Sequence, residues 1–230
     1  KGKSDIYVDG QQKNAPFHLE LNDGKHHCIQ DGYNNYYLVN GDNIQVQIAR
    51  QDSRHEKTRI ETQGTFASVY INHGVTPQNA AYEYMVLIQP TPEELNAARR
   101  KAPYRIIHKD NIAHVVADKQ TGITAYAAFE TYLPQKDELF LSIPAETMVM
   151  QKQSGSNILL SVCDPNLNIS EKAFTTKEPS RPIEKKLILK GKWRSTTPHE
   201  KITVHSNQAE TIVTVTCQHG QPVEFTLEKL

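Results

Sequence analysis

The ten histidines are the residues of this sequence that first suggest metal chemistry. His26 and His27 are adjacent, and adjacent strand residues point to opposite faces, so these side chains do not readily share one ion. No HExxH pattern and no short HxH pair occurs anywhere in the chain. Residues 31–35 and 41–43 resemble fragments of calcium loops but lack the spaced acidic ligands and the closing glutamate. The sequence therefore predicts no metal site and no cofactor in this segment.

Familiar catalytic motifs are also missing from the sequence. It has no Gly-x-Ser-x-Gly nucleophile elbow, no P-loop and no Gly-x-Gly-x-x-Gly turn after a strand. Glu93 and Glu94 form a carboxylate pair, but acidic residues at this place favour the N-terminus of a helix. We therefore assign no catalytic, cofactor-binding or metal-binding residue from the residue pattern.

Two aromatic features leave a binding role open. Tyr33, Asn34, Asn35, Tyr36 and Tyr37 combine the aromatic rings and amides that carbohydrate ligands use. The same segment also fits a turn that leads into a strand with core tyrosines, and this interpretation is favoured.

The only tryptophan, Trp193, is interpreted in the same way. It fits either a stacking platform for a sugar or, preferably, a core anchor at a strand end. The three cysteines, Cys28, Cys163 and Cys217, each lie in a strand-like run, which predicts buried free thiols.

The elements that must position these residues are mostly strands. Apolar residues alternate with polar ones at 44–49, 213–217 and 223–228, a period of two that predicts strands with one dry face. Such strands are typical of antiparallel sheets packed as sandwiches. A single helix is predicted near 92–101, because Thr91 and Glu94 form a capping box and Pro92 suits the first helical position. Alternation is lost at 130–138 and 174–182, which are the candidate domain boundaries.

Composition excludes two classes of protein. Lysine plus arginine and aspartate plus glutamate number 26 each, so a basic nucleic-acid binder is not expected. No apolar run approaches the roughly 18 residues of a membrane span. The chain begins with Lys1 and shows no signal segment, so it is expected to be a processed or internal piece of a longer protein.

One segment carries a more specific resemblance. Residues 70–86, with the pattern His-Gly, Pro and Ala-x-Tyr-x-Tyr, resemble a stretch of the family 8 polysaccharide lyases. Residues 159–168, which contain Asp164-Pro165, resemble a strand and turn of the small C-terminal sandwich in that family. Gly191–Trp193 and residues 222–227 resemble its last strands, and residues 79–86 point to the chondroitin ABC branch. The resemblance runs from about Thr65 to Leu230.

This resemblance implies an all-β architecture. Such lyases carry a helical toroid, then a large antiparallel super-sandwich, then a smaller β-sandwich. Residues 1–135 are therefore expected to be the end of the super-sandwich, and 136–230 the small C-terminal β-sandwich, with one short helix near 92–101. Because residues 1–135 would complete a larger sandwich, they are expected to show open sheet edges and an uncovered apolar face.

The resemblance also implies a chemistry that this piece does not carry by itself. Family members cleave uronate-containing polysaccharides by β-elimination, in which a tyrosine acts as general base and acid, a histidine or asparagine helps neutralise the uronate carboxylate, and an arginine supports the site. In the family these residues lie on the helical domain, so no catalytic residue is transferred here, and His73 is interpreted as structural.

Expected partners are a glycosaminoglycan, reached through the parent enzyme, and the upstream domains of the same polypeptide, with no nucleic acid and no membrane span. Any divalent cation is expected elsewhere in the parent enzyme. A secreted or periplasmic bacterial location is implied by the resemblance alone. Two alternatives remain: a non-catalytic carbohydrate-binding β-sandwich of another polysaccharide-active protein, or a structural or adhesion protein with tandem sandwiches.

Overall fold

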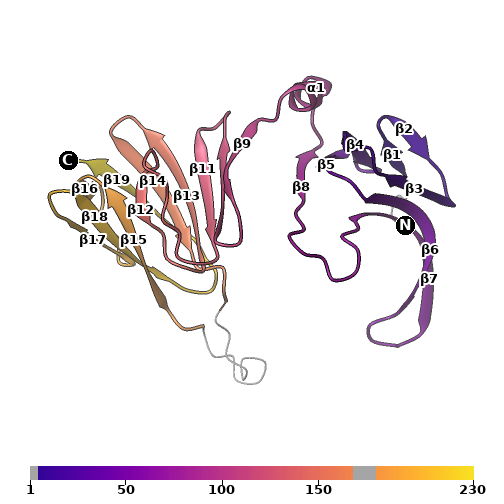
Figure 1. Cartoon of the computed structure of the whole chain (residues 1–230). Helices are drawn as coiled ribbons and strands as arrows, with labels where there is room; N and C mark the ends of the chain where they lie inside the picture. Colours follow the sequence, from indigo (N-terminus) through magenta and orange to yellow (C-terminus); the bar gives the residue numbers. More distant parts are fainter. Residues whose placement is uncertain (1–4, 168–179) are drawn as a thin grey trace. The chain divides into compact units, whose positions relative to one another are not determined.

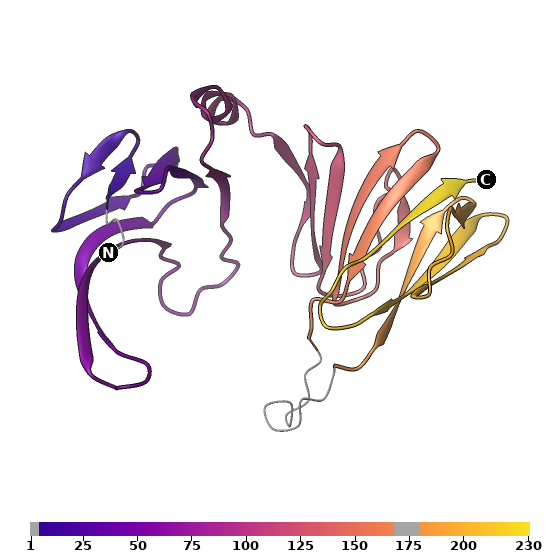
Figure 2. The same ribbon diagram turned by 180° about the vertical axis from the view of Figure 1, so that it is seen from behind.

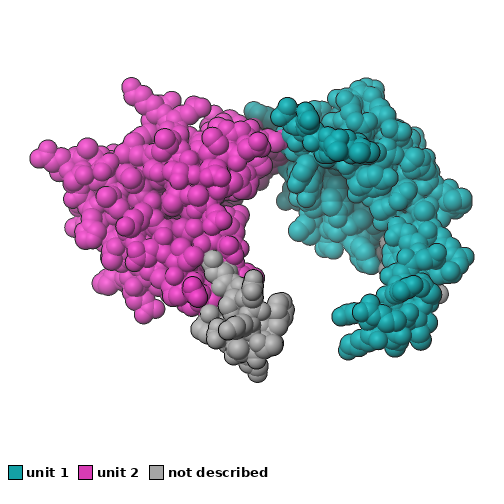
Figure 3. All heavy atoms as spheres, turned by 60° about the horizontal axis from the view of Figure 1, so that its bottom comes forward, with its two compact units in different colours: residues 1–102 teal, residues 103–230 magenta. Residues whose placement is uncertain are grey.

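The computed structural model describes residues 5–167 and 180–230. The chain divides into two compact units, residues 1–102 (unit 1) and residues 103–230 (unit 2), which are distinguished by colour in Figure 3. Much of the candidate boundary at 174–182 lies outside the described residues, so the structure does not test it.

The described residues form an all-β fold with a single helix, as predicted. Every strand pair is antiparallel. The elements of unit 1 are β1 (Ile6–Val8), β2 (Gln11–Lys13), β3 (Phe17–Leu21), β4 (His26–Asp31), β5 (Asn35–Asn40), β6 (Ile44–Arg54), β7 (Glu61–Ile71), β8 (Glu83–Ile88) and α1 (Pro92–Arg100). Those of unit 2 are β9 (Tyr104–Lys109), β10 (Ala113–Asp118), β11 (Ile123–Ala128), β12 (Phe140–Ser142), β13 (Thr147–Ser154), β14 (Asn157–Cys163), β15 (Ile183–Lys190), β16 (Trp193–Ser195), β17 (Ile202–Ser206), β18 (Glu210–Cys217) and β19 (Val223–Lys229).

Unit 1 consists of two sheets. A five-stranded sheet has the order β2-β1-β4-β5-β8, and a three-stranded sheet has the order β3-β6-β7. Alternate residues of β6, among them Ile44, Val46 and Ile48, are fully buried against Ile29 and Val39 of the larger sheet. The far halves of β6 and β7 continue beyond this core as a long, curved, exposed hairpin (Figure 1).

Helix α1 begins where the capping box predicted. The Glu94 backbone N–H donates to the Thr91 hydroxyl, and the Glu94 carboxylate accepts the Thr91 backbone N–H, so two orphan donors are satisfied reciprocally. Glu93 and Glu94 lie in the first turn and Arg99 and Arg100 in the last, which complements the helix dipole. The carboxylate pair is therefore a helix start, as the sequence indicated.

Unit 2 is a sandwich of a seven-stranded and a four-stranded sheet. Their strand orders are β16-β19-β14-β13-β11-β10-β9 and β12-β15-β18-β17, and Figure 2 shows the two layers from behind. The inward residues of β18 and β19, such as Val213, Val215 and Leu227, are almost fully buried. One core cluster joins residues of both sheets, which closes the sandwich.

The division between the compact units lies at 102/103 and not at the expected 135/136. Strands β9, β10 and β11 pair onto β13 in the seven-stranded sheet, so residues 104–128 share the core of unit 2. Residues 129–139 lose alternation because they cross from one sheet of the sandwich to the other. The Lys190 ammonium fixes this crossing by donating to the carbonyls of Gln135, Lys136 and Glu138. The assignment of either unit to a super-sandwich or a C-terminal sandwich stays a prediction.

Candidate functional site

The tyrosine-rich segment forms a turn followed by strand β5, as the favoured interpretation predicted. Asp31 organises the turn: its carboxylate accepts the backbone N–H groups of Tyr33 and Asn35 at 2.8 and 2.9 Å, and the Asn35 amide at 2.9 Å. Burial acts to raise the pKa of Asp31, but the hydrogen bonds from Asn35, Tyr33 and Tyr37 outweigh it and hold the pKa below its usual value. Asp31 is thus a structural carboxylate that stays ionised.

The same segment lines a cavity of unit 1, a hollow of about 1180 Å³ between β5, β7 and β8. We call it the aromatic groove, and its aromatic lining residues are Tyr33, Tyr37, Phe66, Tyr70, His73, Tyr82 and Tyr84. Tyr82 stacks on Tyr84 with ring centroids 6.1 Å apart and lies 6.3 Å from the His73 ring. Tyr33, Tyr82 and Tyr84 are each more than half exposed. The groove therefore brings together the two tyrosine clusters that the sequence showed separately.

The aromatic groove also lies on the face of the five-stranded sheet that packs against the three-stranded sheet. This face is covered at β1 and β4 but is open at β8. Val8, Ile29, Tyr37 and Val86 follow one another across β1, β4, β5 and β8 in register. Val8 is 5% exposed and Ile29 is 1% exposed, but Val86 is 41% exposed. Ile88, two residues further on the same face of β8, is 79% exposed. An uncovered apolar face in the N-terminal part was expected from the sequence, and it is confirmed.

The charge of the aromatic groove limits what it can bind. Among its lining residues Asp5 and Asp31 are acidic, and none is a lysine or an arginine. A sulfated, uronate-containing chain would meet two carboxylates there and no fixed cation to balance its own charge. The lining therefore suits an apolar or uncharged occupant.

Three tyrosines of the described residues have shifted pKa values, and each shift is upward. Burial, followed by Asp31, raises the pKa of Tyr37. Burial, followed by Glu138, raises the pKa of Tyr132 to about 12 and raises that of Tyr126 as well. A tyrosine that serves as a general base works best with a pKa near the operating pH, so these three are unsuited to that role.

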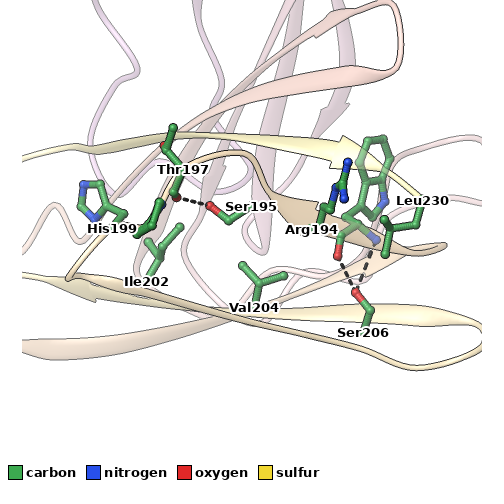
Figure 4. A pocket seen from close by; sticks show the side chains of 10 residues that line it. Arg194, Ser195, Thr197, His199, Ile202, Val204, Ser206 and Leu230 are labelled. Atoms are coloured by element: carbon green, nitrogen blue, oxygen red, sulfur yellow. Dashed lines mark hydrogen bonds between the residues drawn. The ribbon is translucent and has the colours of Figure 1, made fainter.

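A smaller cleft of about 400 Å³ lies in unit 2 between the edge strands β16 and β17. Ile202 and Val204 form its apolar floor, and Ser195, Thr197 and His199 lie along its rim (Figure 4). The Ser206 hydroxyl closes one end by donating to the Trp193 carbonyl at 2.5 Å. The Ser195 hydroxyl donates to the Thr197 carbonyl at 2.5 Å, and a carbonyl does not act as the general base that would activate it as a nucleophile.

Trp193 is a core anchor and not a platform. It is 4% exposed, belongs to the core cluster of unit 2, and its indole N–H donates to the Lys190 carbonyl at 2.8 Å. Arg194 beside it is engaged with Glu228, whose carboxylate accepts its Nε and Nη2 groups at 3.0 and 2.6 Å. The preferred interpretation of Trp193 is therefore confirmed.

Buried polar groups at one end of unit 2 escaped the sequence reasoning. The Asp164 carboxylate, 2% exposed, lies 3.1 Å from the Lys185 ammonium, which also donates to the Ala145 carbonyl. The Ser180 hydroxyl lies 2.8 Å from His219 Nδ1 and accepts the His219 backbone N–H, which fixes the turn after β18. These contacts join strands distant in sequence, and no local motif signals them.

The histidines and cysteines are dispersed through the fold. His26 is exposed beside Asn40, whereas His27 is buried, as opposite faces of a strand require. In the described part of the chain no group of three histidine, cysteine or acidic residues is placed so that it could hold a metal ion. Cys28 and Cys217 are buried free thiols, as predicted, while Cys163 is partly exposed. His73 follows strand β7, and nothing in the structure tests its structural interpretation.

Comparison with known proteins gives relatives over nearly the whole chain. No family model matches the sequence. The chain is 26% identical over 231 aligned positions to the chondroitin sulfate ABC endolyase of Proteus vulgaris, covering 98% of this chain and 22% of that enzyme. It is 30% identical to the chondroitin sulfate ABC exolyase of Bacteroides thetaiotaomicron, over 78% of this chain and 20% of that enzyme. The chain thus spans about a fifth of the length of these relatives.

Solved structures agree on the fold. A xanthan lyase from Paenibacillus superposes with a TM-score of 0.70 and 15% identity, over 100% of this chain and 22% of that one. A chondroitin AC lyase from Streptomyces coelicolor A3 superposes with a TM-score of 0.64 and 14% identity, over 93% of this chain and 28% of that one. The resemblance to polysaccharide lyases that the motifs indicated is confirmed, and this chain is similar to a part of the chondroitin sulfate ABC lyases. Among the described residues, no helix has the length and apolar character that crossing a membrane requires.

Proposed function

We propose that this chain is the C-terminal β portion of a lyase that depolymerises glycosaminoglycans of the chondroitin and dermatan sulfate type. The parent enzyme would act by β-elimination and leave 4,5-unsaturated uronate ends. The observation that carries the proposal is the similarity to a chondroitin sulfate ABC endolyase over 98% of this chain. A secreted or periplasmic location belongs to the same proposal, because the polymeric substrate is extracellular.

The catalytic groups of this reaction would lie in other domains of the polypeptide. β-Elimination requires a base that removes the proton next to the uronate carboxylate and positive charge that stabilises the resulting anion. Tyr37, Tyr126 and Tyr132 have raised pKa values and are unsuited to act as the base. The lining of the aromatic groove carries acidic residues and no lysine or arginine, so it does not supply the positive charge. We therefore assign this piece the role of supporting and shaping the substrate cleft.

Upstream strands of the same polypeptide are the partner that we propose for the aromatic groove. In the described part of the chain β7 and β8 are edge strands of their sheets, and an edge strand can pair with a further strand. The inward side chains of β8, Tyr84, Val86 and Ile88, are 41–79% exposed, and an added sheet layer would bury them. The absence of lysine and arginine from the groove lining suits such an apolar partner.

A carbohydrate-binding module is the second candidate function, and the aromatic groove is the observation that favours it. Stacked, exposed tyrosines such as Tyr82 and Tyr84 are surfaces on which sugar rings pack. An uncharged saccharide would then fill the groove in place of protein strands. Tyr82→Ala should abolish such binding, whereas Tyr7→Ala, on β1 outside the groove, should leave it unchanged.

The test is an ultraviolet assay with two proteins and two substrates. The 230-residue chain and a longer polypeptide that carries it are incubated with chondroitin sulfate and with dermatan sulfate, and absorbance of the unsaturated product is followed. We expect product from the longer polypeptide only, because loss of general acid–base groups typically costs about 10²–10⁴-fold in rate. Product from the chain alone would show that we placed catalysis in the wrong domain. No product from either protein, together with saccharide binding that depends on Tyr82, would replace the lyase by the binding module.

A further inference from the structure

A single buried histidine joins two turns of unit 1. His27 lies on β4 and is 6% exposed. Its Nδ1 is 2.8 Å from Asp9 Oδ2 in the β1–β2 turn, and its Nε2 is 2.8 Å from Asp23 Oδ1 in the β3–β4 turn. One imidazole ring therefore makes two short contacts to two different carboxylates.

Counting protons shows which form of the ring this geometry requires. A neutral imidazole has one N–H donor and one lone pair, and an ionised carboxylate can only accept. With a neutral ring, one of the two 2.8 Å contacts would place a lone pair against a carboxylate oxygen. The hydrogen bond from His27 and those from Lys25 hold the pKa of Asp23 at about 2, so that carboxylate does not carry the missing proton. Both contacts are satisfied together when His27 is an imidazolium.

The two aspartates differ in how firmly the rest of the fold holds them. Asp9 is anchored to the strand independently of the ring, because its backbone N–H donates to the Cys28 carbonyl and its Oδ1 accepts the Cys28 N–H at 2.9 Å. The other partners of Asp23 belong to its own turn: the Lys25 N–H at 3.1 Å and the Lys25 ammonium at 3.2 Å. The strand residue opposite His27 is the uncharged Val39 of β5.

Arg99 of α1 acts on the thiol of Cys28, the neighbour of His27, and Asp42 lies in the connection from β5 to β6. Its Oδ1 accepts the Gly24 N–H at 2.7 Å and so contacts the Asp23 turn and not the ring. The ring therefore contacts Asp9 and Asp23, while Lys25 and Asp42 contact the turn that carries Asp23.

We propose that Asp9, His27 and Asp23 form a pH-sensitive clasp in which the charged imidazolium holds both turns, and loss of its proton releases the turn that carries Asp23. The neutral ring keeps its single N–H for Asp9, which the strand already fixes in place. The turn at residues 23–25 then loses its attachment to β4, and the exposed hydrogen bond from the Gly24 N–H to Asp42 opens more often once the turn is free.

The pH range of the clasp follows from the directions of the two shifts. Burial by itself lowers the pKa of His27, but the hydrogen bonds that the ring donates to Asp9 and Asp23 outweigh it and raise the pKa above 6.5. The contribution of the imidazolium to stability is fully present below pH 6.5 and disappears as the pH rises through the raised folded value. The contribution of Asp23 is present above pH 3.8 and is lost as the pH falls towards 2. The clasp is therefore closed at mildly acidic pH and opens on the alkaline side.

Nitrogen NMR and amide exchange on the 230-residue chain test the clasp between pH 5 and 10. We expect both ring nitrogens of His27 to be protonated at pH 6, and the exchange rates of the Gly24 and Lys25 amides, corrected for intrinsic rates, to rise at least tenfold as His27 titrates. Asp23→Asn should lower the midpoint of the His27 titration. His205→Gln, an exposed histidine on β17, should leave that midpoint unchanged.

Three results would overturn the proposal: a ring with one protonated nitrogen at pH 6, corrected exchange at residues 24 and 25 that stays flat through the His27 titration, or an Asp23→Asn midpoint equal to that of the unmodified chain. Asp23→Asn changes an exposed turn residue, so the test does not depend on a variant that removes a buried side chain.

Discussion

Replacing Val86 by threonine should barely change the stability of unit 1, whereas the same replacement of Val8 should destabilise it by about 1–3 kcal/mol. The two valines are a matched pair. Both lie on strands, and both belong to the row that crosses the five-stranded sheet through Ile29 and Tyr37. Threonine is β-branched like valine and has good strand propensity, so the comparison isolates the cost of placing a hydroxyl at each site.

The difference in cost comes from access to water. Val8 is 5% exposed and is part of the core cluster, so a hydroxyl there lies among apolar side chains. Val86 is 41% exposed and pairs with the groove residue Tyr37, so water can hydrogen-bond a hydroxyl there. We therefore expect a loss below about 0.5 kcal/mol at Val86, the range of ordinary surface substitutions. In a longer polypeptide whose strands cover this face, Val86→Thr should become as costly as Val8→Thr.

Urea-dependent amide exchange at β4 and β5 measures the stability of unit 1 directly. The fluorescence of Trp193, the only tryptophan, reports on unit 2 and should not change in either variant. Equal losses for Val8→Thr and Val86→Thr in a chain that is monomeric by size exclusion would refute the reasoning. The inner face of β8 would then already be covered within the 230 residues.

Two further substitutions test particular contacts. Thr91→Ala removes the hydroxyl that accepts the Glu94 N–H and should lower the stability of α1 by about 0.5–2 kcal/mol. The loss should be seen as faster amide exchange at Glu94, and unchanged exchange would show that the cap contributes nothing. Asp164→Asn leaves the Lys185 ammonium, 7% exposed, without its carboxylate and should destabilise unit 2 by about 3–5 kcal/mol. The loss is measured by Trp193 fluorescence in urea. A loss below about 1 kcal/mol would mean that the Ala145 carbonyl alone satisfies the ammonium.

Local patterns in the sequence predicted local structure well. The alternation at 44–49 and 213–217 became strands with one buried face, because a period of two is a property of each strand by itself. The helix was found from Thr91, Pro92 and Glu94, which satisfy backbone donors within one turn. The single tryptophan was correctly placed in the core.

Contacts between distant segments were not predictable in the same way. Alternation shows that a strand has two faces but not which sheet it joins, so it could not show that residues 104–128 pair into the seven-stranded sheet of unit 2. The aromatic groove depends on β5 pairing with β8, which brings Tyr37 beside Val86 from a distant part of the sequence. His27 was correctly assigned the face opposite His26, but its partner Asp9 lies 18 residues away and no spacing rule connects them. Pairing between strands is decided by the whole core, and a single sequence does not display it.

Separating the chain between Ala102 and Pro103 tests the division into units. Among the described residues, twenty buried apolar residues form the core cluster of unit 2 and seven form that of unit 1, although the units are similar in length. Residues 103–230 should therefore unfold cooperatively as a monomer, with an unfolding enthalpy of about 90 kcal/mol near 60 °C at about 0.7 kcal/mol per residue. Residues 1–102 should self-associate through the apolar face of β8 and the open edges of β7 and β8.

A fragment cut at the boundary that the sequence suggested is the matched control. Residues 136–230 lack β9, β10 and β11, so the seven-stranded sheet would lose three strands and expose the core side chains Val149 and Leu160 to water on one flank. We expect this fragment to aggregate or to show no cooperative transition in calorimetry, in contrast to 103–230. If 136–230 unfolds as cooperatively as 103–230, a smaller sandwich is already closed without strands β9 to β11. If 1–102 is instead a cooperative monomer, its open face needs no partner, and the carbohydrate-binding interpretation of the aromatic groove becomes the stronger one.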